Sequence, residues 1–329
     1  MSEYTGREAD GPWPEEDPGS EGLEGLPLDE RLEAMARAFE AERPRLLRVA
    51  YTTTGSLAES EDCVQEAWIR LRGTLGRTEI HDLRGWLVTT VGRLALDALG
   101  SAKARRESYV GTWLPEPVVE DDPAEQVTLD ESVSLALLVV LEQLSPAERT
   151  AFVLHDVFGV SFAEVAEIVG RTPAAVRQLA SRARRHVADG RPRFPPTPAQ
   201  QRALVAAFAD ACQQGDLSGL VELLDPDVAW RGDGGGRVTT TARTQYGAMR
   251  VAKGILLALS GASGLTMRLA TVNGVPGLVV YEHGGDVSVV SFGMDEGRIT
   301  SIDVVRNPEK LNTVVRLERD GSRLFPDRE

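Results

Sequence analysis

The 329-residue sequence has few of the residues that build disulfide frameworks or metal sites. It contains two cysteines, Cys63 and Cys212, and four histidines. No histidine is spaced from a cysteine or from another histidine in the way that zinc ligands are. Because the two cysteines fall in different predicted domains, we expect two buried, reduced thiols rather than a disulfide. The sequence predicts no bound metal and no cofactor.

Long apolar runs are also missing. No apolar run exceeds seven residues, the length of Leu135 to Leu141, whereas a membrane-spanning helix needs about 20. The chain starts without a basic stretch followed by an apolar one, which excludes a standard secretory signal. These features predict a cytoplasmic protein with no membrane partner.

Positively and negatively charged residues are concentrated in different segments of the chain. A net charge of -14 argues against a nucleic-acid partner, because phosphate binding depends on clustered Lys and Arg. However, residues 171–193 hold seven arginines against one acid, and residues 84–106 hold five bases against one acid. The segment between them, residues 107–131, holds eight acids and no base. Since local fields decide binding, two DNA-facing surfaces joined by an acidic connector are possible.

Hydrophobic periodicity places helices in the first half of the chain. A composition of 42% hydrophobic and 26% charged residues is that of a globular protein long enough for two or three domains. Apolar residues near the 3.6-residue period predict two all-α domains, at 29–103 and 130–190. Segments without this period are predicted as an acidic disordered tail (1–28), an acidic linker (104–129), a proline-rich linker (191–198) and a C-terminal tail (312–329).

Residues 199–311 have a different pattern. Helical stretches at 199–214, 217–224 and 247–259 come first. Four short strands rich in Val and Ile follow, separated by hairpin signals such as Asn273-Gly274. We expect these strands at 266–272, 277–282, 287–294 and 299–305. Helices followed by an antiparallel meander predict an α+β domain.

The strongest local motif is a pair of capped helices. Ser145 and Ser161 each precede a glutamate by three residues, as in a capping box. The helices 161–169 and 173–188 are joined by a tight turn at Gly170, as in helix-turn-helix readers of DNA. The second helix has an apolar face and a polar face whose Arg and Gln side chains suit base edges and phosphates. A basic solvated helix in an ordinary bundle is the alternative.

Taken together, the two helical parts carry a family resemblance. The stretches are Ala58–Leu71 (AESEDCVQEAWIRL), Leu83–Leu87 (LRGWL) with Arg93–Asp97 (RLALD), and Leu144–Arg149 (LSPAER) with Arg177–Arg182 (RQLASR). Through them residues 30–190, about half of the chain, resemble an extracytoplasmic-function (ECF) sigma factor of the sigma-70 family. The resemblance implies a region-two domain and a region-four helix-turn-helix domain without region three.

The resemblance implies three binding surfaces on these domains. The partners would be promoter DNA and core RNA polymerase, through its β′ clamp helices and β flap. For the −35 element the implied residues are Arg171, Arg177, Gln178, Ser181, Arg182 and Arg185. For the −10 element they are Arg84, Trp86, Arg93, Lys103, Arg105 and Arg106, where Trp86 is either a core residue or a stacking platform. For the polymerase they are Asp62, Gln65 and Glu66, which from the residues alone could equally form a solvated helix face.

The back half resembles a SnoaL-like (cystatin-like) domain, found as an extension of the ECF sigma factors of group 41. The marks of that group are Tyr109–Pro117 (YVGTWLPEP), Trp230–Arg237 (WRGDGGGR) and Arg306–Leu311 (RNPEKL). The resemblance implies that the extension contacts region two and the linker, regulates the sigma factor in place of a separate anti-sigma factor, and encloses a pocket that could take a small ligand. The implied regulatory residues are Trp113, Leu114, Pro115, Glu116, Pro117, Asp233, Gly234, Gly235, Gly236, Asn307, Pro308 and Lys310.

Some alternatives stay open at this point. Asp233 could cap its glycine turn, accept hydrogen bonds from the linker, or act as a base in a pocket. The whole chain is most simply a promoter-specificity subunit that performs no covalent chemistry itself. The alternatives are a SnoaL-like cyclase or isomerase with a fused helical part, and a ligand-sensing one-component repressor.

Overall fold

The computed structural model describes most of the three domains but few residues of the tails. The described residues are 27–75, 80–107, 109, 111–120, 134–190, 196–241, 243–261, 265–282, 285–311 and 314. Residues 1–26 of the predicted acidic tail, nearly all of the C-terminal tail, residues 121–129 of the acidic linker and residues 191–195 of the proline-rich linker lie outside them. Both cysteines are free and buried, as expected. None of the helices in these ranges is long and apolar enough to cross a membrane.

The N-terminal helical domain consists of three helices, α1 (Leu28–Thr54), α2 (Leu57–Thr74) and α3 (Leu83–Glu107). Gly55 ends α1 with a φ of 74°, a left-handed conformation that glycine adopts without strain. The hydroxyl of Ser56 then accepts a hydrogen bond from the amide of Glu59 and begins α2. The α3 helix continues four residues beyond residue 103, where the sequence placed the start of the linker.

The second helical domain contains α4 (Leu135–Leu141), α5 (Pro146–Phe152), α6 (Phe162–Val169) and α7 (Pro173–Gly190). Both predicted capping boxes are confirmed, at Ser145 before α5 and at Ser161 before α6. Gly170 ends α6 with a φ of 66°, so the predicted tight turn is also confirmed. A π-helical turn, η1 (Val153–Val157), follows α5 and was not predicted.

The C-terminal domain begins with α8 (Pro198–Gln214) and α9 (Leu217–Leu223) and contains α10 (Ala248–Ser260). Its sheet has the strand order β1-β4-β5-β6-β7-β2-β3. The predicted antiparallel meander is confirmed as β4 (Thr266–Val272), β5 (Val275–Tyr281), β6 (Val287–Asp295) and β7 (Arg298–Val305). The domain closes with a short 3-10 turn, η2 (Pro308–Lys310).

The sequence missed three strands of this sheet. The first, β2 (Leu224–Asp233), pairs in parallel with β7, and β3 (Gln245–Tyr246) pairs with β2. Acidic residues and a proline interrupt the start of β2, and its main partner lies about seventy residues further on, so no hairpin signal marks it. The third is β1 (Val119–Glu120), which comes from the linker and pairs with the edge strand β4.

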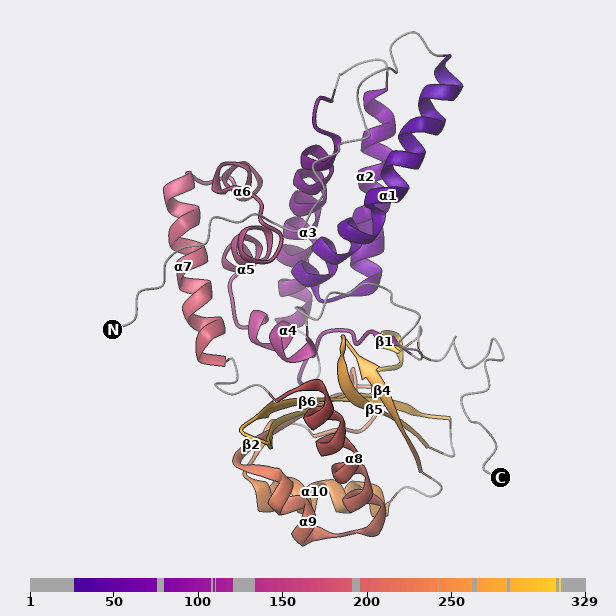
Figure 1. Ribbon diagram of the computed structural model, residues 1–329, viewed down its shortest axis with the longest axis vertical. Helices are drawn as coiled ribbons and strands as arrows, with labels where there is room; N and C mark the ends of the chain where they lie inside the picture. The colour runs from indigo at the N-terminus through magenta and orange to yellow at the C-terminus, as the bar shows by residue number, and fades with distance from the viewer. Residues whose placement is uncertain are drawn as a thin grey trace.

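The sheet has different neighbours on its two faces. Helices α8, α9 and α10 cover one face and form a core with it that includes Phe208 and Phe292. The opposite face of the sheet is turned toward the rest of the molecule (Figure 1) and packs against Leu114 of the linker and Val139 of α4. The predicted fold class, two all-α domains and a SnoaL-like α+β domain, is therefore confirmed. The sheet is also the surface on which the linker lies.

Candidate functional site

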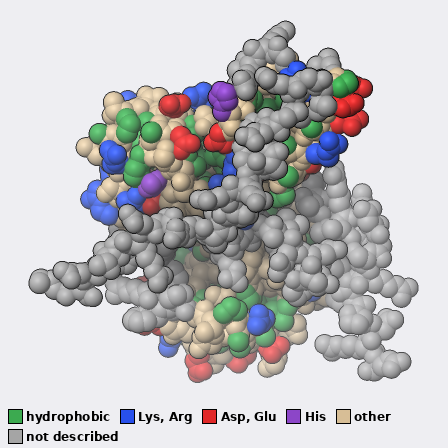
Figure 2. Space-filling view, turned by 45° about the horizontal axis from the view of Figure 1, so that its top comes forward, with side chains coloured by type: hydrophobic (Ala, Val, Ile, Leu, Met, Phe, Trp, Pro, Cys, Tyr) green, Lys and Arg blue, Asp and Glu red, His purple; other side chains and the backbone are tan. Residues whose placement is uncertain are grey.

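The outward face of α7 has the predicted composition. Arg177, Gln178, Ser181, Arg182 and Arg185 are all exposed, as is Arg171 in the preceding turn. The opposite face is buried, with Val176, Ala180, Ala183 and Val187 in the core. Lys and Arg side chains gather at the left edge of Figure 2, on the side where α7 lies. Thus α7 has an exposed basic face, and the major groove of DNA is wide enough to admit an α-helix.

Two of these arginines are held by neighbouring helices. The Nε of Arg182 lies 2.8 Å from a carboxylate oxygen of Glu148, whose pKa is lowered chiefly by its hydrogen bond from the Ser145 hydroxyl. The guanidinium of Arg177 lies 5.3 Å from the ring centre of Phe162, within the range of a cation–π contact. These contacts orient the two side chains and leave them exposed.

Of the predicted −10 residues on α3, Arg84 is partly buried and Arg93 is exposed. Arg84 donates through Nε to Glu42 of α1 over 2.9 Å, and Arg93 donates to the carbonyl of Glu167 in α6 over 3.4 Å. Trp86 is half-buried and packs against the core of the helical domains. The side chains of Lys103, Arg105 and Arg106 lie outside the described residues. At Arg93 the second helical domain therefore contacts the α3 surface that would read DNA.

The two helical domains share one hydrophobic core. Leu87 and Val91 of α3 belong to the same cluster as Val165 of α6. At the crossing of α3 and α6, a Cβ on Gly92 would lie 3.2 Å from a methyl of Leu154 and 3.3 Å from a methyl of Ile168. The absence of a side chain at position 92 is what lets the two helices approach so closely. The structure therefore shows the two helical domains in contact.

The predicted polymerase-binding residues lie together on α2. Asp62 and Gln65 are exposed, and Glu66 is half-buried and pairs with Arg70 over 2.9 Å. Ile69 lies one turn further along and is 46% exposed, although it is a large apolar residue. Ile69 is not among the residues predicted from the sequence for this surface. Its position one helical turn after Gln65, on the polar side of α2, is the signal that could have indicated an exposed apolar residue there.

Asp233 joins the linker to the C-terminal domain. Its side chain is fully buried at the end of β2. One carboxylate oxygen accepts from the Tyr109 hydroxyl at 2.5 Å and from the Gly235 amide at 3.1 Å. The other accepts from the Leu114 amide at 2.9 Å and from the Lys310 ammonium at 2.7 Å. Of the three roles left open by the sequence, the structure thus shows two at once, the turn and the linker contact.

Lys310 completes this junction from η2. Its ammonium lies 3.9 Å from the ring centre of Trp113, contacts the ring of Tyr109 at 5.3 Å, and donates to the carbonyl of Leu114. Asn307 donates to the Tyr109 hydroxyl over 2.8 Å. Burial, more than the hydrogen bond to Asp233, raises the pKa of Tyr109 well above its usual value. The aromatic side chains of the linker therefore lie against a cation whose side chain is only 11% exposed.

The glycine cluster makes the junction compact. A Cβ at Gly234 would lie 1.9 Å from the carbonyl oxygen of Val238. Gly235 has a φ of 63°, and a Cβ there would lie 2.6 Å from the side chain of Asn307. Gly236 also has a positive φ, 69°. Pro308 begins η2 directly after Asn307. The turn between β2 and the following loop thus requires glycine for both its backbone angles and its close contacts.

A second junction was not predicted and connects three parts of the molecule. The hydroxyl of Tyr51, near the end of α1, donates to the carbonyl of Glu116 over 2.6 Å and accepts from the side-chain amide of Asn273 over 2.7 Å. Asn273, in the β4–β5 turn, also exchanges two hydrogen bonds with the backbone of Val118. The Asn273-Gly274 signal predicted the turn, but nothing in it indicated these partners.

Glu116 anchors the linker to the start of α2. Its carboxylate accepts from the amide of Leu57 at 2.8 Å and from the hydroxyl of Ser56 at 3.3 Å. These are free donors at the beginning of a helix, where negative charge is favoured. Burial is nevertheless the larger influence and raises the pKa of Glu116. Pro115 and Pro117 on either side are buried with it.

A buried arginine links the helical domains at the same place. Arg149 of α5 is 1% exposed, pairs with Glu142, and donates to the carbonyl of Thr52 near the end of α1 over 3.4 Å. A Cβ on Gly55 would lie 3.3 Å from this guanidinium and 3.2 Å from the ring of Trp113. The end of α1, the linker, α5 and the C-terminal domain therefore meet around Trp113.

Comparisons with known proteins agree with this architecture. Residues 38–105 match the family Sigma-70 region 2, and residues 134–187 match Sigma-70, region 4. The ECF RNA polymerase sigma factor SigJ of Mycobacterium tuberculosis is 43% identical over 291 residues, which cover 83% of this chain and 92% of SigJ. The probable ECF sigma factor SigI of the same species is 38% identical over 84% of this chain and 95% of SigI.

A solved structure is similar to this chain over most of its length. The crystal structure of M. tuberculosis SigJ superposes with a TM-score of 0.68 at 39% identity, covering 84% of this chain and 98% of that one. The fold is that of a transcription initiation factor that combines two sigma domains with a SnoaL-like extension. This chain belongs to the ECF sigma factors of the sigma-70 family. Such proteins direct core RNA polymerase to promoters, as the resemblance in the sequence implied.

Proposed function

We propose that the C-terminal domain holds this sigma factor in a closed state by binding its linker, and that promoter recognition requires the linker to be released. The observation that carries the proposal is the double junction of the linker, at Asp233 with Lys310 and at Asn273 with Tyr51. Both junctions attach the linker to the C-terminal domain, and the second also attaches it to α1.

The separation of promoter elements supports the proposal. A sigma factor must contact two elements about two helical turns apart, roughly 70 Å. In the structure the two helical domains share a core, and Arg93 of α3 contacts α6. The linker of 26 residues, 104–129, could span about 85 to 90 Å when extended. The linker is therefore long enough for the two helical domains to separate, but it must first dissociate from β4 and Asp233.

The individual surfaces are assigned on the same grounds. The exposed face of α7, with Arg171, Arg177, Gln178, Ser181, Arg182 and Arg185, would read the −35 element. The α3 surface with Arg84, Trp86 and Arg93, continued by Lys103, Arg105 and Arg106, would act at the −10 element after opening. Asp62, Gln65 and Glu66 would dock on the β′ clamp helices, while the second helical domain would meet the β flap.

The bonding of Asp233 favours a regulatory role for the C-terminal domain over an enzymatic one. The four hydrogen bonds to its two oxygens use the four acceptor sites of a carboxylate. A general base needs an open site toward its substrate. We therefore propose a built-in regulator that acts in the cytoplasm, without a separate anti-sigma factor. A small ligand of this domain stays a prediction with no assigned residues.

A reconstituted transcription assay with core polymerase tests the proposal. It compares the full chain with a chain that ends at Gly190, at equal amounts of polymerase-bound protein. We expect promoter-specific transcripts that depend on the added chain, and a different yield per bound polymerase when the C-terminal domain is removed. Equal yields from the two chains would contradict the regulatory role. An absence of transcripts with both would contradict the sigma activity itself.

A further inference from the structure

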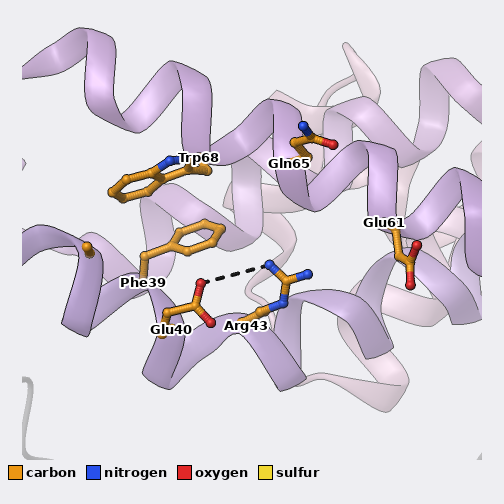
Figure 3. A pocket seen from close by; sticks show the side chains of 7 residues that line it. Phe39, Glu40, Arg43, Glu61, Gln65 and Trp68 are labelled. Atoms are coloured by element: carbon orange, nitrogen blue, oxygen red, sulfur yellow. Dashed lines mark ion pairs between the residues drawn. The ribbon is translucent and has the colours of Figure 1, made fainter.

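A groove lies between α1 and α2, outside the junctions described above. Its volume is about 330 Å³, near the lower limit of small-molecule pockets, which measure roughly 300 to 1,000 Å³. Figure 3 shows the aromatic rings at one end and the polar side chains around the rest of the groove. It is lined by Ala36, Phe39, Glu40, Arg43, Glu61, Gln65 and Trp68.

The floor of the groove is aromatic. The rings of Phe39 and Trp68 lie 5.1 Å apart at an angle of 48°. Phe39 is buried, whereas Trp68 is half-buried and borders the groove. The face of an indole ring attracts a cation more strongly than the other aromatic side chains do. A cation that enters the groove would therefore find a favourable surface at Trp68.

The rim adds negative charge. The carboxylates of Glu40 and Glu61 are exposed and border the groove. The one base in the lining is Arg43, and the carboxylate of Glu40, 3.9 Å away, offsets its positive charge. Asp62 adds a further exposed carboxylate one position after Glu61. An aromatic floor under an acidic rim is complementary to a positively charged group with an apolar stem.

The groove is continuous with the surface proposed to dock on the polymerase. Gln65 lines the groove and is also one of the three predicted docking residues. The lining comes entirely from α1 and α2, and in Figure 1 these helices extend away from the sheet of the C-terminal domain. As far as the described residues go, the closed state therefore leaves this surface accessible while it encloses the linker.

We propose that this groove is a socket for a single cationic side chain, Arg or Lys, of the polymerase subunit that docks on α2. This inference rests on the proposed function and adds a residue-level site to it. The carboxylates of Glu40 and Glu61 attract the cation, and Trp68 receives it. Because the socket is open in the closed state, the polymerase can capture the protein before the linker is released.

The size and charge of the groove favour this occupant over two others. A drug-sized ligand would need a larger and more enclosed cavity. An apolar side chain would fill the aromatic end, but it would add no positive charge to a rim where Glu40 and Glu61 face one base, Arg43. A long cationic side chain satisfies both ends of the groove at once.

The test measures binding of the full chain to core polymerase, without promoter DNA, at low and high salt. The double variant Glu40→Gln with Glu61→Gln removes the rim charge and keeps the side-chain shape. The matched control, Glu30→Gln with Glu33→Gln, makes the same charge change at exposed positions of α1 outside the groove. We expect the groove variant to bind about tenfold more weakly than the control at low salt, with a smaller dependence on salt.

A second variant tests the aromatic floor. Trp68→Phe keeps an aromatic ring but gives a weaker surface for a cation, so we expect weaker binding with an unchanged fold in circular dichroism. Equal affinities of the two double variants would overturn the socket, and tighter binding of the groove variant would indicate an apolar occupant instead. If the unmodified chain does not bind core polymerase at all, the proposed function fails rather than the socket alone.

Discussion

Asp233→Asn is the substitution that tests the linker junction most sharply. The asparagine has nearly the same shape, but it replaces one acceptor oxygen with a donor and removes the negative charge. The changed atom then faces either the Tyr109 hydroxyl and the Gly235 amide, or the Leu114 amide and the Lys310 ammonium. In the first orientation the Gly235 amide faces another donor, in the second the Leu114 amide and the Lys310 ammonium do, and in both the Lys310 cation loses its ion pair.

The magnitude follows from the kind of contact that is lost. Removing one partner of a buried ion pair costs about 3 to 5 kcal/mol, and hydrogen bonds to charged groups contribute about 1.5 to 3 kcal/mol each. Lys310 keeps the Leu114 carbonyl and the Trp113 ring as partners, so the lower end applies. About 3 kcal/mol corresponds to a shift of roughly a hundredfold toward the released linker.

Amide hydrogen exchange in the linker measures this shift. We expect the Leu114 amide, which donates directly to Asp233, to exchange about a hundredfold faster in Asp233→Asn than in the unmodified chain. The control Asp286→Asn removes an exposed carboxylate of the same domain, 3.8 Å from Arg306, and should leave the linker unaffected. Unchanged exchange at Leu114 in Asp233→Asn would refute the reasoning.

Four further substitutions test other parts of the account. Gly92→Leu adds a side chain where methyl groups already lie 3.2 to 3.3 Å from the position of a Cβ. The two helical domains should therefore separate, so that chemical cross-links between them become fewer while their helix content stays the same. Tyr51→Phe leaves two buried polar groups without their partner, and thermal unfolding should show a loss of about 2 kcal/mol; a loss below 0.5 kcal/mol would contradict the second junction. Burial raises the pKa of Glu116 and so favours its protonated form in the folded state. The stability that this group contributes is fully present below about pH 4.3, the pKa of an unperturbed glutamate, and is lost as the pH rises through the pKa of Glu116 in the folded state. The unfolding midpoint should therefore fall less between pH 4.5 and 7.5 in Glu116→Gln than in the unmodified chain. Arg177→Ala should cost about 1 to 3 kcal/mol at one base position of the −35 element, and equal losses for every promoter sequence would assign Arg177 to a phosphate instead.

The sequence predicted the elements that depend on local signals. The helix starts at Ser145 and Ser161 and the turn at Gly170 come from side chains within a few residues of the backbone they cap. The meander from β4 to β7 is marked by alternating apolar residues and by hairpin turns. In each case, the residues that determine the structure are neighbours in the chain.

The parts that were missed depend on residues far apart in the chain. β2 is defined by a parallel partner, β7, and β1 by an edge that exists only once β4 is formed. The hydrogen bonds among Tyr51, the Glu116 carbonyl and Asn273 span 65 and 222 positions. The acidic, proline-containing linker has no periodic pattern, because the surface that orders it belongs to other segments. Composition therefore predicted its extended backbone but not its partners.

The central claim is that the helical domains are together in the free protein and apart on the promoter. The direct measurement is the distance between spin labels at Asp97 of α3 and Ala188 of α7, both exposed, in the free chain and in its complex with core polymerase and promoter DNA. We predict one short distance in the free chain and a distance of roughly 70 Å in the complex. The same short distance in a transcriptionally active complex would contradict it.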